Sequence, residues 1–159
     1  MSRGVATASF WLALVVWLGQ VVFFSFTVAP AVFRALPPET AGQVVGVIFP
    51  RYYALGALAG IVALAAALVL RAGTSATAPW STICAMLALM LVATLYAGRV
   101  VFPRAQALRP RLHEAAVDPD AQAAFDRLHR RAVGLNGAVL LLGITTVCVA
   151  ARTFTLPSR

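Results

Sequence analysis

The chain has 159 residues, of which 61% are apolar and only 11% are charged, whereas soluble domains have roughly 45–50% and about 25%. This composition excludes an ordinary soluble fold, which has no interior for so much apolar surface, and indicates one integral membrane domain. The net charge of +8 comes from thirteen arginines at the ends of long apolar runs, a placement that sets membrane topology and argues against nucleic-acid binding.

Four uncharged stretches are long enough to cross about 30 Å of hydrocarbon, and backbone groups in lipid require that they be helical. We place the spans at about 7–32, 52–71, 79–101 and 131–152, in a single domain covering 1–159. The predicted fold class is an all-α membrane protein, a four-transmembrane-helix bundle.

The connection between the first two spans has structure of its own. The segment Pro37-Pro38-Glu39-Thr40 is typical of a helix start, with proline and an acid where the free N–H groups and the helix dipole favour them. An apolar patch over residues 44–49 follows, and Pro50 comes after it. We predict a short interfacial helix that lies along the inner membrane surface.

The connection between the last two spans has a sharper signal. Asp118 precedes Pro119, which is the order of a capping acid and a first-turn proline. A helix from Pro119 to Arg152 is about 50 Å long at 1.5 Å per residue, so it begins with a cytoplasmic helical extension before span four. We expect span three to extend to about Leu108 and to form a helical hairpin with this extension.

The arginines predict the orientation. The two connections on one side hold nine of them and the opposite side holds four, so the Arg-rich 1–2 and 3–4 connections are cytoplasmic and both termini are outside. We expect a bacterial inner (plasma) membrane. The nine are Arg34, Arg51, Arg99, Arg104, Arg109, Arg111, Arg127, Arg130 and Arg131, and the four are Arg3, Arg71, Arg152 and Arg159.

A weak internal repeat runs through the chain. Pro30 and Pro103 are 73 positions apart, and each is followed by another proline seven residues later. The segments 49–53 and 125–129 share the pattern Phe-x-Arg-x-aromatic at an offset of 76. The match indicates two helical hairpins related by an axis along the membrane normal, as in transporters with parallel repeats.

No Asp, Glu, His or Lys lies within a predicted span, which argues against a proton-coupled carboxylate mechanism. The polar residues left in or beside the membrane include Gln20, Tyr96 and Asn136. Two interpretations stay open for them, namely hydrogen bonds between helices, worth about 0.6 kcal/mol each, and contact with a ligand bound between helices.

His129 and Asn136 share a helix face because they are seven residues apart, and Asp126 is placed to orient the imidazole. His129 is therefore either a ligand or proton handler for something bound between helices, or a polar tip at the membrane surface. We expect a site in the groove between spans one and four, bordered by Gln20, Asn136 and His129. No Cys/His cluster of zinc spacing exists, so no metal site is predicted.

Further residues have two interpretations each. Arg51 and Arg99 either form an anion-binding or anionic-lipid patch with neighbouring arginines or only signal topology. The glycine motifs at 56–60 and 134–138 favour close helix crossings, within the bundle or in a homo-oligomer. Cys84 and Cys148 lie at similar depth near the outer side, where a disulfide is possible, although two small apolar residues in a helix interface would have the same pattern.

Several motifs along nearly the whole chain follow the pattern of a known family. They are Trp17-Leu18-Gly19-Gln20, Phe23-Phe24, Ala29-Pro30, Phe33, Leu36-Pro37, Ala41-Gly42, Phe49-Pro50-Arg51-Tyr52-Tyr53, Phe125-Asp126-Arg127-Leu128-His129 and Asn136. In these the chain resembles the bacterial members of the transmembrane protein 205-like family. The resemblance implies a four-span membrane protein; the family's domain has no known function, and a eukaryotic relative is linked to platinum-drug resistance. A looser similarity exists to small haem-associated and copper-resistance bundles.

We therefore expect a non-enzymatic membrane protein in transport, efflux or stress tolerance, with no resident cofactor. One alternative is a haem- or quinone-linked redox protein that uses His129. Another is a structural or assembly subunit of a membrane complex. The expected partners are the lipid bilayer, anionic lipid and further copies of the chain.

Overall fold

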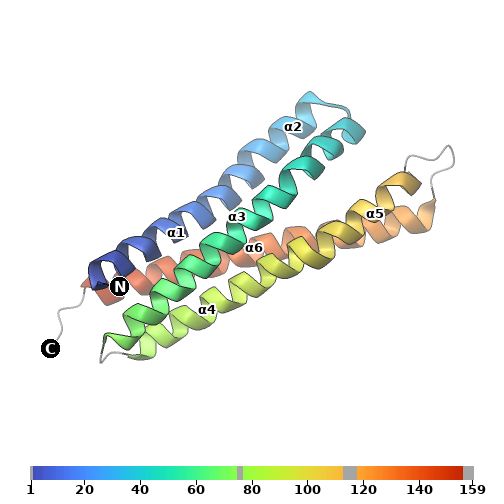
Figure 1. Cartoon of the computed structure of the whole chain (residues 1–159). Coiled ribbons are helices and arrows are strands. Elements are labelled where there is room, and N and C mark those ends of the chain that lie inside the picture. Colours follow the sequence, from blue (N-terminus) through green and yellow to red (C-terminus); the bar gives the residue numbers. More distant parts are fainter. Residues whose placement is uncertain (1, 75–76, 113–117, 156–159) are drawn as a thin grey trace.

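The computed structural model describes residues 2–74, 77–112 and 118–155, and the regular structure in these ranges is helical throughout. Four helices in them are long and apolar enough to span a membrane, which confirms the predicted fold class. The start of α1 and the end of α6 lie at one end of the bundle, and the α2–α3 connection lies at the other (Figure 1). The elements are α1 (Arg3–Phe23), η1 (Phe24–Val28), α2 (Ala29–Ala35), α3 (Pro38–Ala72), α4 (Thr77–Tyr96), η2 (Ala97–Val101), α5 (Phe102–Leu112) and α6 (Pro119–Thr155).

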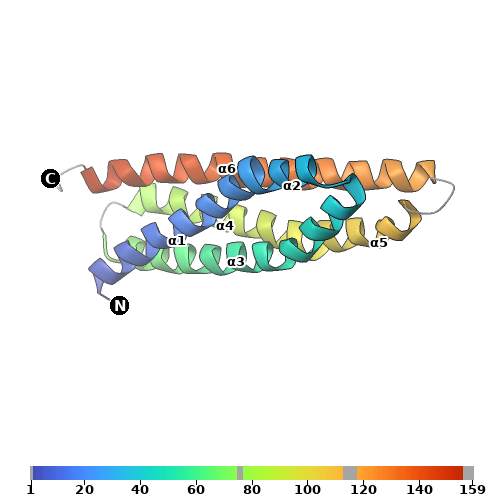
Figure 2. The ribbon, with the colours of Figure 1, turned by 90° about the horizontal axis from the view of Figure 1, so that it is seen from above.

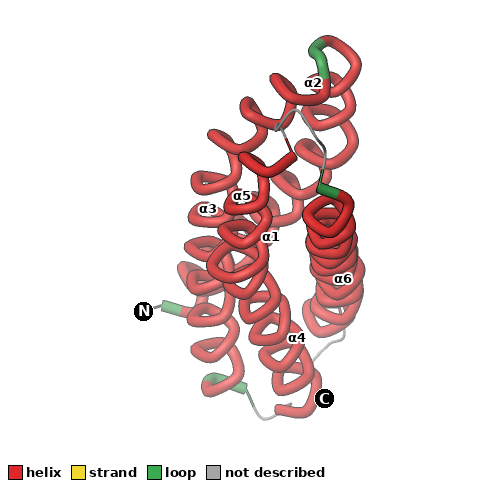
Figure 3. Tube along the Cα trace, turned by 90° about the vertical axis from the view of Figure 1, so that its right-hand side faces the viewer, coloured by secondary structure: helices red, strands yellow, loops and turns green. Residues whose placement is uncertain are grey.

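The helices pack in the order α1, α3, α4 and α6. The contacts of α1 with α3, of α3 with α4 and of α4 with α6 are extensive, whereas α1 and α6 touch only briefly. Seen from the side in Figure 3, α6 forms a column of its own next to α4. Consequently, α3 is the most buried of the four spans and α6 is the least buried.

Large residues of α1 pack against small residues of α3. Phe10, Leu14 and Trp17 are fully buried, and the α3 face toward them consists mainly of alanine and glycine. A Cβ built on Gly60 would lie 2.7 Å from the Trp17 ring, so only glycine allows this approach. The motif at 56–60 therefore packs inside the bundle, whereas a Cβ on Gly134 would have no neighbour within 4 Å.

Two π-helical turns interrupt the first and third spans at equivalent places. In η1 the Ala29 N–H donates to the Phe24 carbonyl, and in η2 the Phe102 N–H donates to the Ala97 carbonyl. A proline follows immediately in each case; it lacks an N–H and its ring would collide with a carbonyl in an α-helix, so a wider turn gives the ring room. The two turns are 73 residues apart, the same offset as the prolines in the predicted repeat.

The expected interfacial helix is not a separate element. Residues 38–49 are the first turns of α3, which continues through Pro50 to Ala72, and Figure 2 shows α3 bending on the side of α2. These turns pack against α5, since a Cβ on Gly42 would meet the Arg109 guanidinium and one on Gly46 would meet the Gln106 amide. Packing on both sides of Pro50 holds the helix together, so the proline bends it without ending it.

The predicted start of the last helix is confirmed. The Asp118 carboxylate accepts hydrogen bonds from the Asp120 and Ala121 N–H groups at 3.0 and 3.3 Å. From Pro119, α6 runs unbroken for 37 residues. Its first turns pair with α5, which gives the predicted helical hairpin at the end of the bundle opposite the N-terminus (Figure 1).

Candidate functional site

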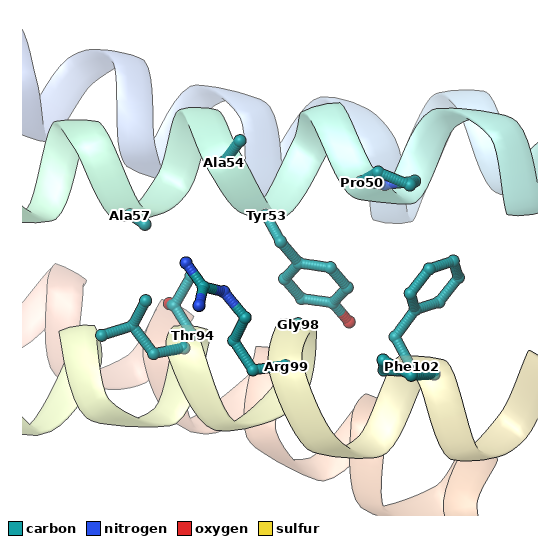
Figure 4. Close-up of a pocket in the computed structure, with 10 residues that line it drawn as sticks. Pro50, Tyr53, Ala54, Ala57, Thr94, Gly98, Arg99 and Phe102 are labelled. Atoms are coloured by element: carbon teal, nitrogen blue, oxygen red, sulfur yellow. The ribbon is translucent and has the colours of Figure 1, made fainter.

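A cavity of the described chain lies between α3 and the stretch from the end of α4 to the start of α5. Its volume is about 310 Å³, and Figure 4 shows it between the two ribbons. We call it the α3–α4 groove. Its lining residues are Pro50, Tyr53, Ala54, Ala57, Thr94, Leu95, Gly98, Arg99, Phe102 and Pro103.

Irregular backbone and small residues create this groove. Pro50 bends α3 on one side, and η2 widens the helix on the other. A Cβ on Gly98 would lie 2.8 Å from Tyr53 Cβ, so the helices touch there and separate at Ala54 and Ala57, where the side chains are too short to fill the space. The groove is therefore a consequence of where proline and glycine stand in the two helices.

Arg99 is the charged residue of the lining. In Figure 4 its guanidinium points away from Phe102, toward Ala57 and Thr94, which is the direction of the bundle centre. Boundary arginines normally extend the other way, so that the charge reaches water. Arg51 does this, since it donates to the Val47 carbonyl one turn nearer the inner end, at 3.4 Å. The two arginines thus point in opposite directions and do not share a site.

An aromatic cluster closes the inner end of the groove. The Phe49 ring centroid is 5.5 Å from those of Tyr53 and Phe102, and Phe24 packs against Phe49 at 5.1 Å. Tyr52 joins the cluster, 5.2 Å from both Phe24 and Tyr53. These rings connect the first, second and third spans and separate the groove from the inner end of the bundle.

Gln20 lies deep in the bundle, behind the groove. A Cβ on Gly56 would be 2.6 Å from Gln20 Nε2 and 3.3 Å from Thr94 Cγ2, so Gln20 faces α3 and α4. Its Oε1 is buried and accepts no hydrogen bond from the described residues. Thr94 links the surroundings of Gln20 to the groove, because it touches Gly56 and also lines the groove.

Asn136 also faces α3, since its Oδ1 accepts a hydrogen bond from the Tyr52 hydroxyl at 3.4 Å. Gln20 and Asn136 therefore meet the same face of α3 one turn apart, at Gly56 and Tyr52. His129 does not join them. It is exposed on α6, and its ring stacks on Phe125 with centroids 6.4 Å apart.

The other predicted residues are spread over the surface. Asp126 does not orient His129 but accepts a hydrogen bond from the Gln122 amide at 3.0 Å. Tyr96 is 42% exposed at the end of α4. Cys84 and Cys148 are both free thiols, the first half-buried and the second exposed. Among the residues with described positions, no group of three His, Cys, Asp or Glu could hold a metal ion.

The sequence did not predict this groove. A site was expected between spans one and four, whereas the α3–α4 groove lies between spans two and three, and Tyr53 and Gly98 were not among the candidate site residues. A signal was present: Pro50 and Pro103 both lie at the inner ends of these spans, where a proline opens helix packing. Which helix faces the opening depends on rotation about each helix axis, which hydropathy alone does not fix.

A family model described as a domain of unknown function (DUF4149) matches residues 12–114. These residues include the second half of α1, all of α3 and α4, and all ten residues that line the α3–α4 groove. No curated protein and no solved structure matches the chain.

Proposed function

From the premise that the chain belongs to this family with a domain of unknown function, we propose that it is a non-enzymatic membrane protein that binds a small hydrophobic or amphipathic molecule in the α3–α4 groove. Binding there is one step in transport or efflux of that molecule, or in tolerance of it. The observation that supports this proposal is a cavity of about 310 Å³ at membrane depth with one charged side chain turned into it. Ligand sites of proteins are usually mostly apolar, with a few polar groups that orient the ligand.

The packing of the bundle determines how a ligand reaches the groove. The outer half of the core is filled by buried side chains, among them Phe10, Trp17, Ile83, Leu87 and Met90, so this conformation has no aqueous path along the bundle axis in its described part. In contrast, Ala54, Leu95 and Arg99 of the groove are exposed. Entry is therefore lateral, from the lipid.

We further propose a location and an orientation in the membrane from the arginine distribution. The protein lies in a bacterial inner membrane, with both termini outside and the groove in the cytoplasmic half. Arg51 and Arg99 then mark the inner boundary of spans two and three. The proposal also agrees with the resemblance to the transmembrane protein 205-like family, a relative of which is linked to drug resistance.

The test is flux from liposomes of amphipathic fluorescent dyes with positive, zero and negative charge. We expect the wild-type protein to speed the loss of at least one dye. Ala57→Trp, which fills the groove, should abolish this effect. Ala65→Trp is the matched control, because Ala65 is exposed on α3 two turns away and does not line the groove.

Two outcomes would overturn the proposal. One is that no dye leaves faster than from protein-free liposomes. The other is that Ala57→Trp and Ala65→Trp behave alike, which would mean that transport does not use the groove.

A further inference from the structure

We infer that the ligand of the α3–α4 groove is an anionic amphiphile of the inner leaflet, a single alkyl chain with a carboxylate or phosphate head that pairs with Arg99. This inference rests on the proposed function, since it names the class of molecule that the groove binds. The observations that support it are the direction of the Arg99 side chain and the shape and polarity of the groove walls around it.

Arg99 brings a positive charge into the lining of the groove. Its guanidinium is turned toward the bundle centre (Figure 4), and it has no hydrogen bond or ion pair with another residue that the structure describes. A cation at membrane depth is unfavourable without a partner. The described acids are elsewhere: Glu39 is in the first turn of α3, Asp118 and Asp120 are at the start of α6, and Asp126 pairs with Gln122. An anion from outside the chain would complete this site.

The guanidinium of Arg99 also fits the shape of particular anionic head groups. A guanidinium presents parallel N–H donors that fit the two oxygens of a carboxylate or phosphate. The Thr94 side chain lies beside the guanidinium in Figure 4, and its hydroxyl is a further donor. The positive charge of Arg99 would repel a cationic head, so the groove discriminates by charge.

The walls of the groove suit the alkyl chain of the ligand. Ala54, Ala57 and Leu95 give the groove apolar walls, and Ala57 lies on the side toward which the guanidinium points (Figure 4). The volume of about 310 Å³ is at the lower limit of ligand sites, which suits a small head and part of one alkyl chain. The exposure of Ala54 and Leu95 lets the rest of the chain remain in the lipid.

The experiment measures binding to the protein in nanodiscs of zwitterionic lipid, by displacement of dansyl-undecanoate. The competitors are undecanoate, lysophosphatidate, undecanol and undecylamine. For the wild type we expect undecanoate to bind roughly tenfold or more tightly than undecanol, and undecylamine to bind weakest. Whether undecanoate or lysophosphatidate binds more tightly distinguishes a free fatty acid from a phosphate-headed lipid, and either order supports the inference.

Arg99→Gln should remove the preference for the acid and leave undecanol binding unchanged. Arg99→Lys, which keeps the charge but not the paired donors, should retain part of the preference and shows that the site still folds. Arg104→Gln is the matched control, because it removes the same charge from an exposed position on α5 outside the groove.

If wild type binds the acid and the alcohol equally and Ala57→Trp abolishes both, the anionic ligand is wrong while binding in the groove stands. If Ala57→Trp changes the binding of no competitor, the groove is not a site and the proposed function fails as well.

Discussion

The close approach of α1 and α3 predicts that Gly60→Ala is destabilising, although alanine is the better helix former. The new Cβ would lie 2.7 and 2.9 Å from two carbons of the Trp17 ring and 3.0 Å from Leu91 Cδ1. Trp17 is fully buried and rigid, so its ring has no room to move. Overpacking of this kind costs about 1–3 kcal/mol.

The same substitution at Gly137 separates the effect of packing on the free energy of unfolding from the effect of helix propensity. Gly137 is exposed on α6, and a Cβ there would have no neighbour within 4 Å. Replacing glycine by alanine in a helix gains about 1 kcal/mol, and this gain is common to both variants. The difference in free energy of unfolding between Gly60→Ala and Gly137→Ala therefore isolates the overpacking of about 1–3 kcal/mol.

The assay is reversible unfolding in mixed micelles of mild detergent and dodecyl sulfate, followed by far-UV circular dichroism and tryptophan fluorescence. Gly137→Ala should be as stable as wild type or slightly more stable, and Gly60→Ala should be less stable than Gly137→Ala. Equal stabilities of the two variants would refute the argument that Gly60 is required by the Trp17 ring.

Two further predictions follow from single contacts, and a third follows from the proposed orientation. Asp118→Ala removes the cap of α6 and should cost about 1 kcal/mol, seen as faster hydrogen exchange of the amides that follow it; unchanged exchange would mean that the cap does not hold the first turn. Tyr52→Phe and Asn136→Leu each remove the hydrogen bond between α3 and α6, and a double-mutant cycle should give a coupling of about 0.6 kcal/mol; strict additivity of the two changes would contradict the bond. In a cysteine-free background, Ser2→Cys should react with an impermeant maleimide on intact cells and Asp120→Cys only after permeabilisation, and the reverse pattern would invert the proposed orientation.

The sequence was sufficient where structure depends on local chemistry. Asp118 and Pro119 mark the start of α6 because a carboxylate cap and a first-turn proline act within one turn of helix. The four spans follow in the same way from the length of uncharged stretches. The sequence was not sufficient at Pro50, because whether a proline ends a helix or bends it depends on what packs around both halves.

The candidate site was harder to predict, because it depends on rotation about the helix axes. Gln20 and Asn136 were expected to border one groove, and both face α3 rather than each other. The π turns add a further difficulty for the residues that follow them, such as Phe102 after η2. Each places one more residue in a turn than an α-helix does, which rotates all following side chains by about 100°. A helix face that is extended from Gln20 past η1, or from Thr94 past η2, with α-helical spacing therefore points in the wrong direction.

The weak coverage of α6 has a consequence for handling the protein. In its most apolar stretch, α6 has 17% of its residues buried, against 44% for α3. The rest of the chain therefore leaves most of the surface of this stretch uncovered, and in a bilayer the acyl chains would be its packing partners. Exchanging these chains for detergent during extraction changes the surroundings of α6 far more than those of α3, so the choice of amphiphile is a variable of the tertiary structure itself.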